Sequence, residues 1–341
     1  MTDPIKLIGN VASPYTRKMI AYLRYKRIPY EVIWGQPEDV LKKMNIEPPK
    51  PILLPVFILK RDGQATAVTD STPLIREFEE KYPVRSVLPK DPALNFINFI
   101  LEDFGDEWCT KFMFHYRWHF DEDADNAGTI LPLGINSALK DDELAFFKEH
   151  FAKRQIDRLW VVGSSNDTAE FIDKSYRNVL SIFEEHFKKH PFLLGNFPSS
   201  CDFAVYGQFT QLVGFDPTPR RIAHEISPRT VAYVNTLDDR GGLDYVEENN
   251  SLDSLSDSIY DLFKELANSY VPTMIKNHEA IKEDEKEWSV DLAGYPWKQK
   301  SFPYQAKCLD WIREEFKDLD NKNQEKVLSF LTTTNCQSLV E

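Results

Sequence analysis

The sequence lacks a long apolar run and a basic cluster. Its longest apolar stretches, such as PILLPVFIL, are far shorter than the roughly 20 residues needed to span a bilayer, and the first residues, MTDPIKLIGN, contain no cationic and apolar leader. Lys and Arg number 41 against 54 Asp and Glu, a net charge of −13. This balance argues against a nucleic-acid or anionic-membrane surface. We therefore expect a cytoplasmic protein with small-molecule or protein partners.

Cysteine is also scarce. The four cysteines, Cys109, Cys201, Cys308 and Cys336, are scattered along the chain without C-x-x-C spacing. This distribution indicates neither a disulfide framework nor a zinc knuckle. We expect reduced thiols in or near the core.

The length and the apolar fraction predict two domains, because 341 residues with 42% apolar side chains exceed one compact core. The first 85 residues alternate strand and helix patterns. In order, the pattern predicts a strand at 5–9, a helix at 14–27, a strand at 30–34, a weaker helix at 37–45, two strands joined at Asp62-Gly63, and a helix at 71–82. This order predicts an α/β thioredoxin-like domain at 1–85, with a four-stranded mixed sheet and helices on both faces.

The segment PVRSVLPKDP at 83–92 contains three prolines and is interpreted as a linker. Beyond it we expect an all-α domain at 92–341, because no convincing strand pair appears after residue 92. The segments with helical periodicity are 92–120, 141–161, 166–190, 202–213, 254–284 and 303–318.

Four motifs stand in order along roughly residues 1–215: SPYTRK, LLPVFIL, TDSTPLIREFE and FLLGNFPSSCDFAVYGQF. Together with the two-domain pattern they resemble the glutathione S-transferase superfamily. The resemblance implies a thioredoxin-like domain that binds glutathione as co-substrate, and a reaction that conjugates it to an apolar electrophile. Relative to shorter transferases, residues 216–341 are an extension. Its end, SFPYQAKCLDWIREEF, looks like that of long bacterial members and supplies no chemistry.

Ser13 occupies the position at which this family places its catalytic residue. Glutathione chemistry needs a thiolate, although a free thiol titrates near about 8.5, and a helix N-terminus supplies unpaired N–H groups and positive potential. Ser13 precedes a helix that opens with Pro14, so its hydroxyl can donate to the bound sulfur; an ordinary N-cap is the alternative. Tyr15 is the rival donor, but we expect it to pack at the domain surface.

The turn also decides which sulfur chemistry is open. Ser-Pro-Tyr-Thr stands where a redox protein carries Cys-Pro-Tyr-Cys. Without its own redox couple, the protein must obtain its sulfur from a bound thiol. A glutathione-dependent thiol reductase is disfavoured for this reason.

The remaining glutathione contacts are expected at two places. Pro55 interrupts a strand pattern, which makes sense if the Leu54–Pro55 bond is cis and leaves the backbone of Leu54 free for the cysteinyl part of glutathione; an edge-strand trans proline is the alternative. Asp70 and Ser71 precede a helix, whose N-terminus is an anion site for the γ-glutamyl carboxylate and is compatible with capping.

The run KFMFHYRWHF is the most aromatic in the chain. Family topology places this helix against the cleft, so Phe112, Tyr116 and His119 are candidates for a second-substrate pocket, with core packing as the alternative. His115 and His119 share a helix face, as metal-binding pairs do, but no third ligand is evident and no metal is expected.

Ser199 and Asp202 fit a capping box and are assigned to folding rather than catalysis. For the whole protein, the leading hypothesis is a glutathione transferase, and the rival is a non-catalytic binding or scaffold protein that kept the fold. A homodimer is expected because dimers are usual in the superfamily and symmetric contacts are the commonest kind. The extension at 216–341 can cover or replace that surface.

Overall fold

The computed structural model describes residues 3–246 and 248–341. Its N-terminal part is a four-stranded sheet in the order β2-β1-β3-β4. The strands are β1 (Ile5–Gly9), β2 (Tyr30–Trp34), β3 (Val56–Arg61) and β4 (Gln64–Val68). β1 runs parallel to β2 and antiparallel to β3, and β3 runs antiparallel to β4. The predicted mixed sheet is therefore confirmed.

Helices cover both faces of this sheet: α1 (Pro14–Lys26) and α3 (Ser71–Lys81) lie on one face, and α2 (Pro37–Met44) on the other. The alternation of strand side chains produces this arrangement. Leu7 and Phe57 are buried in the main core with α1 and α3, whereas Ile8 and Val56 are buried against Leu41 of α2. The sequence pattern thus specified both layers.

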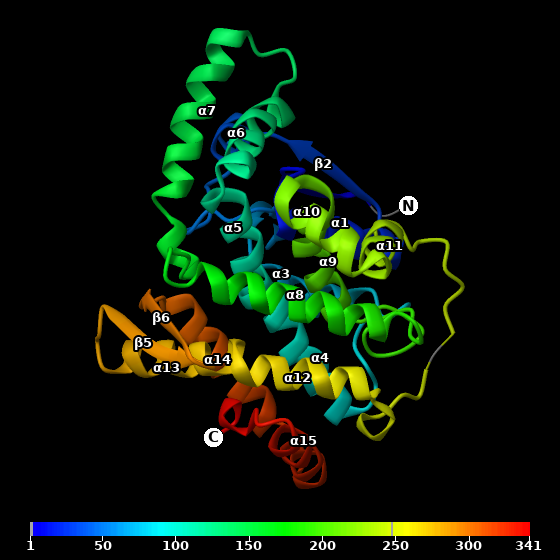
Figure 1. Ribbon diagram of the computed structural model, residues 1–341. Coiled ribbons are helices and arrows are strands. Elements are labelled where there is room, and N and C mark those ends of the chain that lie inside the picture. Colours follow the sequence, from blue (N-terminus) through cyan, green and yellow to red (C-terminus); the bar gives the residue numbers. More distant parts are fainter. Residues whose placement is uncertain (1–2, 247) are drawn as a thin grey trace.

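The rest of the described chain is largely helical, as predicted. In order, it contains α4 (Pro92–Asp103), the π-helical turn η1 (Phe104–Trp108), α5 (Cys109–His119), α6 (Asp121–Ile135), α7 (Asp141–Ile156), α8 (Ala169–His186), α9 (Ser200–Thr210), α10 (Pro217–Ile226), α11 (Pro228–Leu237), α12 (Asp257–Asn268), α13 (Tyr270–Lys282), α14 (Pro303–Lys317) and α15 (Asn321–Thr333). Figure 1 shows α6 and α7 standing out from the body as an arm.

The expectation that no strand pair follows residue 92 is wrong. β5 (Glu287–Leu292) and β6 (Tyr295–Lys300) form an antiparallel hairpin next to α13. Trp288, Leu292 and Trp297 face inward and are buried, while most of the exposed outward positions are charged. The hairpin was missed because only half of each short strand is apolar and Pro296 interrupts the second strand pattern.

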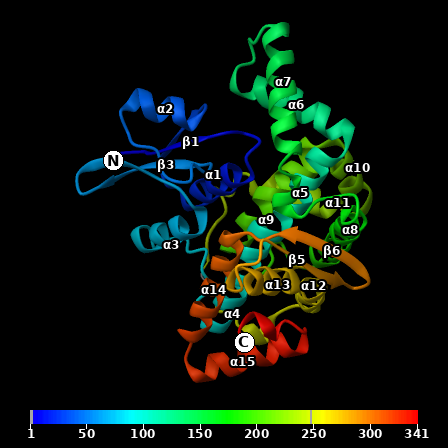
Figure 2. The same ribbon diagram turned by 90° about the vertical axis from the view of Figure 1, so that its left-hand side faces the viewer.

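The helical part packs tightly on the N-terminal part through α9 and α1. Gly207 of α9 is required for this approach, because a Cβ there would lie 2.6 Å from the carbonyl oxygen of Pro14. The extension packs on the other side, where α14 and α15 contact α4, and the rings of Phe96 and Phe316 lie 5.6 Å apart. Figure 2 shows α14 along α4, on the side of the helical part that faces α3.

Candidate functional site

The register of the sheet brings three loops to one edge. Ile8 near the end of β1 pairs with Val56 at the start of β3. Phe57, also at the start of β3, pairs with Val68 at the end of β4. The turn after β1, the loop before β3 and the loop after β4 therefore meet at the same edge, and each carries one of the predicted glutathione contacts.

Ser13 is the N-cap of α1 at this edge. Its Oγ accepts a hydrogen bond of 3.3 Å from the backbone N–H of Thr16, and Pro14 occupies the first helical turn. This bond uses a lone pair of the hydroxyl and leaves its proton available. Capping and donation to a ligand are therefore compatible roles for Ser13.

A buried ion pair holds the turn that precedes Ser13. Arg117 of α5 donates to the carbonyl oxygen of Ala12 at 3.1 Å and pairs with Asp216 at 2.9 Å. Both charged side chains are buried, and burial raises the pKa of Asp216 to about 6 although Arg117 opposes this shift. No sequence pattern indicates this role, because Arg117 stands within an aromatic run.

Tyr15 lies where the N-terminal domain meets η1. Its hydroxyl donates to the backbone carbonyl of Asp106 at 2.8 Å. Burial, reinforced by the neighbouring Glu107, raises the pKa of Tyr15 well above its ordinary value. The phenolic proton is therefore committed to an interdomain contact, which leaves Ser13 as the hydroxyl available at this edge.

Leu54 and Pro55 are placed as the sequence predicts. The Leu54–Pro55 peptide bond is cis, and Pro55 is buried. Within residues 3–246 and 248–341, no hydrogen bond engages the backbone N–H or C=O of Leu54. This stretch of backbone can pair with an extended ligand.

Asp70 and Ser71, in contrast, already have partners. The hydroxyl of Tyr304, from α14 of the extension, donates to Asp70 at 3.1 Å. The ammonium group of Lys18 donates to Ser71 Oγ at 3.1 Å. The predicted γ-glutamyl end of the site is thus occupied by the protein's own side chains.

Lys18 is a fully buried cation between the two domains. Besides Ser71, its Nζ contacts Glu102 Oε1 at 3.1 Å and Asp106 Oδ2 at 2.6 Å. Burial alone would lower the pKa of Lys18, but the two carboxylates outweigh it and raise the pKa. Burial likewise favours neutral Glu102, yet Arg76 and Lys18 outweigh it and hold the pKa of Glu102 at about 2. Lys18 and Glu102 are therefore both charged near neutral pH.

The helical side of this region is rich in carboxyl groups of raised pKa. Burial raises the pKa of Asp103 to about 7, of Asp106 to about 6 and of Glu107 to about 8. A cavity of about 20 Å³ lies among them. Its lining residues are Thr72, Phe99, Asp103, Asp106, Glu107, Tyr304, Cys308 and Trp311. This cavity has room for about one water molecule.

The structure does not bring the predicted second-substrate residues into a pocket. Phe112 and Tyr116 are fully buried in the aromatic core, where Tyr116 donates to Asp173 at 2.6 Å. His119 is only half-buried and stacks on His115 with 4.6 Å between the ring centres. Core packing therefore accounts for Phe112 and Tyr116.

In the part of the chain that the structure describes, no three acidic, His or Cys side chains are arranged to hold a metal ion.

Ser199 and Asp202 begin α9. The backbone N–H of Ser199 donates to Asp202 Oδ2 at 2.8 Å, and that of Leu193 donates to Oδ1 at 2.9 Å. These bonds order the start of the helix that packs on α1.

None of the described helices is long and apolar enough for a membrane span.

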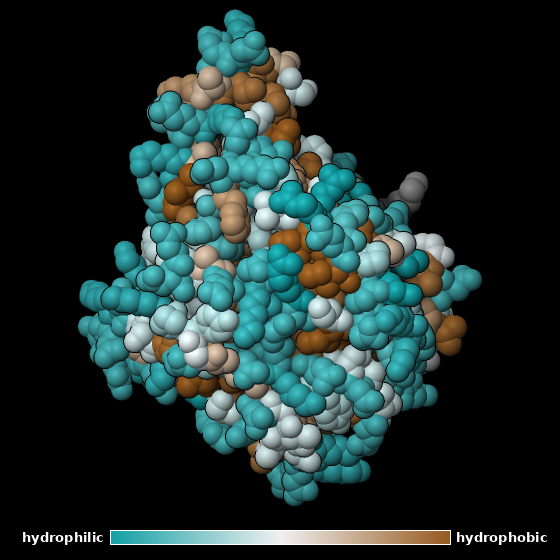
Figure 3. All heavy atoms as spheres, viewed as in Figure 1, coloured by the Kyte–Doolittle hydropathy of each residue, from teal (hydrophilic) through white to brown (hydrophobic). Residues whose placement is uncertain are grey.

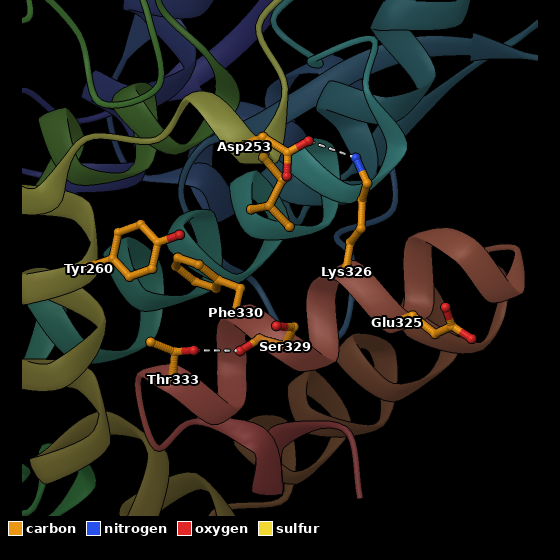
Figure 4. Close-up of a pocket in the computed structure, with 8 residues that line it drawn as sticks. Asp253, Tyr260, Glu325, Lys326, Ser329, Phe330 and Thr333 are labelled. Carbon is orange, nitrogen blue, oxygen red and sulfur yellow. Dashed lines mark hydrogen bonds and ion pairs between the residues drawn. The ribbon is translucent and has the colours of Figure 1, made fainter.

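A groove of about 340 Å³ lies in the extension, between α12 and α15 (Figure 4). Lys326 and Asp253 form an ion pair of 2.9 Å across one side of it, and Thr333 donates to the backbone of Ser329 at 2.9 Å. No residue predicted for function lines this groove. The sheet edge remains the candidate site.

Residues 7–87 match the sequence model described as glutathione S-transferase, N-terminal domain. None of the curated proteins matches the sequence. Similar solved structures include FzlA from C. crescentus, at 16% identity over 70% of this chain and 89% of that chain with a TM-score of 0.43. They also include a glutathione S-transferase from Rhodospirillum rubrum F11, at 17% identity over 72% and 95% of the two chains with a TM-score of 0.42. A third is a glutathione transferase family member from Pseudomonas fluorescens Pf-5 with two glutathione bound, at 14% identity over 70% and 91% with a TM-score of 0.44.

Proposed function

Because the chain belongs to the glutathione S-transferase superfamily, we propose that it binds glutathione at the edge of the N-terminal sheet and transfers the thiolate to an apolar electrophile. One observation carries this proposal. The sheet register places the hydroxyl of Ser13, at the N-terminus of α1, on the same edge as the unpaired backbone of Leu54. A peptide-like thiol needs this combination of backbone partners and a donor for sulfur.

In this proposal the cysteinyl backbone of glutathione pairs with Leu54, and its sulfur approaches Ser13. The Ser13 hydroxyl and the positive end of the α1 dipole stabilise the thiolate, whose proton leaves to solvent. The sulfur then forms a C–S bond with the electrophilic carbon, and the leaving group departs with the electron pair. Stabilisation of a charge that is present at the sulfur is the main contribution of the protein.

The γ-glutamyl end has to compete with the extension. Its carboxylate would lie near Ser71, where the positive charge of Lys18 is favourable. The ammonium group at the same end of the ligand can approach Asp70 only if the hydroxyl of Tyr304 moves away or shares the Asp70 carboxylate with it. We therefore expect the γ-glutamyl end to contribute less to glutathione affinity than the Ser13 end does.

The same contact favours a second candidate function, a non-catalytic protein that kept the fold. Asp70 and Ser71 are satisfied without any ligand, because Tyr304 and Lys18 already bond them. A thiol reductase is not favoured, since residue 13 is a serine and all four cysteines are buried.

Two measurements on the full chain separate the two candidates. Glutathione at millimolar concentration should raise the melting temperature, and turnover should follow with 1-chloro-2,4-dinitrobenzene as the electrophile. S-methylglutathione is the matched control for binding without a reactive thiol, and should stabilise the protein without supporting turnover. No thermal shift with either peptide, together with no retention on immobilised glutathione, would leave the non-catalytic function.

A further inference from the structure

The orientation of the Ser13 side chain depends on the peptide unit that precedes it, and both ends of that unit are bonded. The carbonyl oxygen of Ala12 accepts a bond of 3.1 Å from Arg117, and the N–H of Ser13 donates to the carbonyl oxygen of Asn10 at 3.0 Å. Because a peptide unit is planar, these two bonds hold its plane and with it the direction in which the side chain leaves the backbone. The bond from the Thr16 N–H to Ser13 Oγ then fixes the rotamer.

The bond from Arg117 is the one of these three that the N-terminal part cannot supply. Asn10 and Thr16 are neighbours of Ser13 in the chain, whereas Arg117 stands on α5, 105 residues from Ala12. Local sequence therefore builds the turn, and the helical part holds one end of its last peptide plane.

The guanidinium group of Arg117 is itself held on several sides. Its Nε and Nη2 each lie 2.9 Å from one of the two carboxylate oxygens of Asp216. Nη2 also donates to Gln211 Oε1 at 2.8 Å, and the group lies over the ring of Phe215, 4.6 Å from its centre. Gln211 and Phe215 are the first and last residues of the π-helical turn η3. Because the guanidinium is planar and its N–H groups have fixed directions, these contacts aim Nη1 at the Ala12 carbonyl.

The segment that carries Asp216 is held in turn by α6. Asn126 donates to the carbonyl oxygen of Phe215 at 3.2 Å, and Asp123 accepts a bond of 2.8 Å from the N–H of Thr218. These two bonds lie on either side of Asp216 in the chain. The carboxylate that orients Arg117 therefore has a fixed place in the helical part.

The pair of Arg117 and Asp216 is separated from the other charges of the molecule by its burial. In Figure 3, hydrophilic side chains make up most of the surface of the face that is shown. Arg117 and Asp216, in contrast, are 4% and 0% exposed. Water does not compete for the guanidinium there, so its bond to the Ala12 carbonyl is stronger than the same bond at the surface. Apolar residues often replace a buried ion pair without loss of stability, so the pair favours a role in geometry.

We propose that Arg117 is a positioning residue, which holds the Ala12 carbonyl and thereby directs Ser13 Oγ towards the sulfur of bound glutathione. Asp216 and Gln211 act through Arg117, because they fix its guanidinium. Arg117 itself touches neither the sulfur nor the electrophile. The inference rests on the proposed function for the role of Ser13, whereas the contact with the turn exists without a ligand.

Arg117→Lys separates this role from a general effect of positive charge near the thiolate. Lysine keeps the charge beside Asp216, but without a planar fork it cannot bond the carboxylate, Gln211 and the Ala12 carbonyl together. With 1-chloro-2,4-dinitrobenzene, kcat should fall by a factor on the order of 10 to 100, and KM for glutathione should change by less than about twofold. The pKa of bound glutathione, followed by the ultraviolet absorbance of the thiolate, should rise. A merely structural role would lower the amount of folded protein and leave this pKa unchanged.

Amide hydrogen exchange of the free protein measures the turn directly and needs no ligand. In Arg117→Lys, the N–H of Ser13 should exchange on the order of 10-fold faster, because the other end of its peptide plane has lost one hydrogen bond. Gln211→Met removes the side-chain amide that bonds Arg117 and should produce the same changes to a smaller extent. It decides the question if Arg117→Lys does not fold. Arg177→Lys, in an ion pair on α8 whose arginine side chain is 43% exposed, is the control and should alter neither exchange nor turnover.

The outcomes distinguish this inference from the proposed function. Unchanged exchange of the turn in Arg117→Lys and in Gln211→Met overturns the inference, whether or not the protein binds glutathione. Faster exchange together with an unchanged kcat and an unchanged pKa of the bound thiol also overturns it, because the order of the turn would then not matter to Ser13. Failure of the parent chain to bind glutathione removes the proposed function instead, and the exchange alone then decides whether Arg117 orders the turn.

Discussion

The two ends of the candidate site differ in what already occupies them. At the Ser13 end, a hydroxyl proton and the backbone of Leu54 have no partner within the described residues. At the Asp70 end, Tyr304 and Lys18 bond the groups that the sequence assigns to glutathione. The sulfur end is therefore prepared for a ligand, whereas the γ-glutamyl end is held by the protein itself.

This difference follows from the origin of the groups at each end. Ser13 and Leu54 both stand on loops that connect the strands and helices of the N-terminal part, and Arg117 of the helical part fixes the turn before Ser13. The Asp70 end is shared with α14 and η1, which bring a phenol and several carboxyl groups. Ligand binding at that end is consequently coupled to the packing between domains, and the following predictions test this coupling.

The largest effect is expected at Lys18, the cation that joins the Asp70 end to the helical part. Lys18→Met keeps the length of the side chain but leaves the carboxylates of Glu102 and Asp106 without their buried partner. We expect a loss of about 3 to 5 kcal/mol in the free energy of unfolding, measured by urea denaturation. Lys60→Met, at a side chain that is 81% exposed, is the control and should stay within about 0.5 kcal/mol of the parent. Equal effects of the two changes would show that the Lys18 network does not stabilise the domain contact.

At the open end, Ser13→Ala should lower turnover with a model electrophile by a factor on the order of 10 to 1,000, the range for losing one donor to an anion. Glutathione affinity should change little, because the Ser13 hydroxyl contributes mainly to the thiolate. The loss of the cap itself should cost about 1 kcal/mol of stability.

Ser13→Thr and Tyr15→Phe are the matched variants. Threonine retains the hydroxyl and should preserve turnover. Tyr15→Phe should also preserve turnover, because that phenol donates to the Asp106 carbonyl. The reverse pattern, with an active Ser13→Ala and an inactive Tyr15→Phe, would assign the catalytic hydroxyl to Tyr15.

The extent to which the sequence predicts this site depends on how local each feature is. The four strands of the N-terminal sheet, the cap at Ser13 and the cis bond at Pro55 follow from neighbours in the chain, and the structure contains all of them. Lys18 gave no signal, because its partner Asp106 lies 88 residues away. The contact between Tyr304 and Asp70 spans 234 residues, and no pattern of spacing reports it.

The pH dependence of stability should report the carboxyl groups behind the Asp70 end. The folded protein holds protons on Asp103 and Glu107 up to about pH 7 and 8, whereas the unfolded chain releases them near about pH 4. Where the folded state binds more protons, stability falls as pH rises. The stabilising contribution is therefore present below about pH 4 and is lost progressively as the pH rises to about 8.

The melting temperature between pH 5 and 8 measures this effect. Asp103→Asn combined with Glu107→Gln should flatten the decline, because neutral amides replace the titrating groups. The groups facing the pair are Tyr270 of α13, Gln305 and Cys308 of α14, and Glu102, Asp106 and Lys111 on their own side. Burial lowers the pKa of Lys111 to about 8, and this shift adds stability only at higher pH. An unchanged decline in the variant would assign it to other groups.

The smallest effect, and the most direct test of the difference between the two ends, concerns Tyr304. Tyr304→Phe keeps the ring next to Trp311 but removes the hydroxyl that donates to Asp70. A hydrogen bond of this kind is worth about 0.5 to 1.5 kcal/mol, so glutathione affinity measured by calorimetry should rise by up to about tenfold. Tyr295→Phe, on the β5–β6 hairpin, loses a bond to Glu170 of α8; it is the control and should bind as the parent does. Weaker binding by Tyr304→Phe would mean that the phenol holds Asp70 in its ligand-binding position. In that case the extension completes the γ-glutamyl end rather than competing for it.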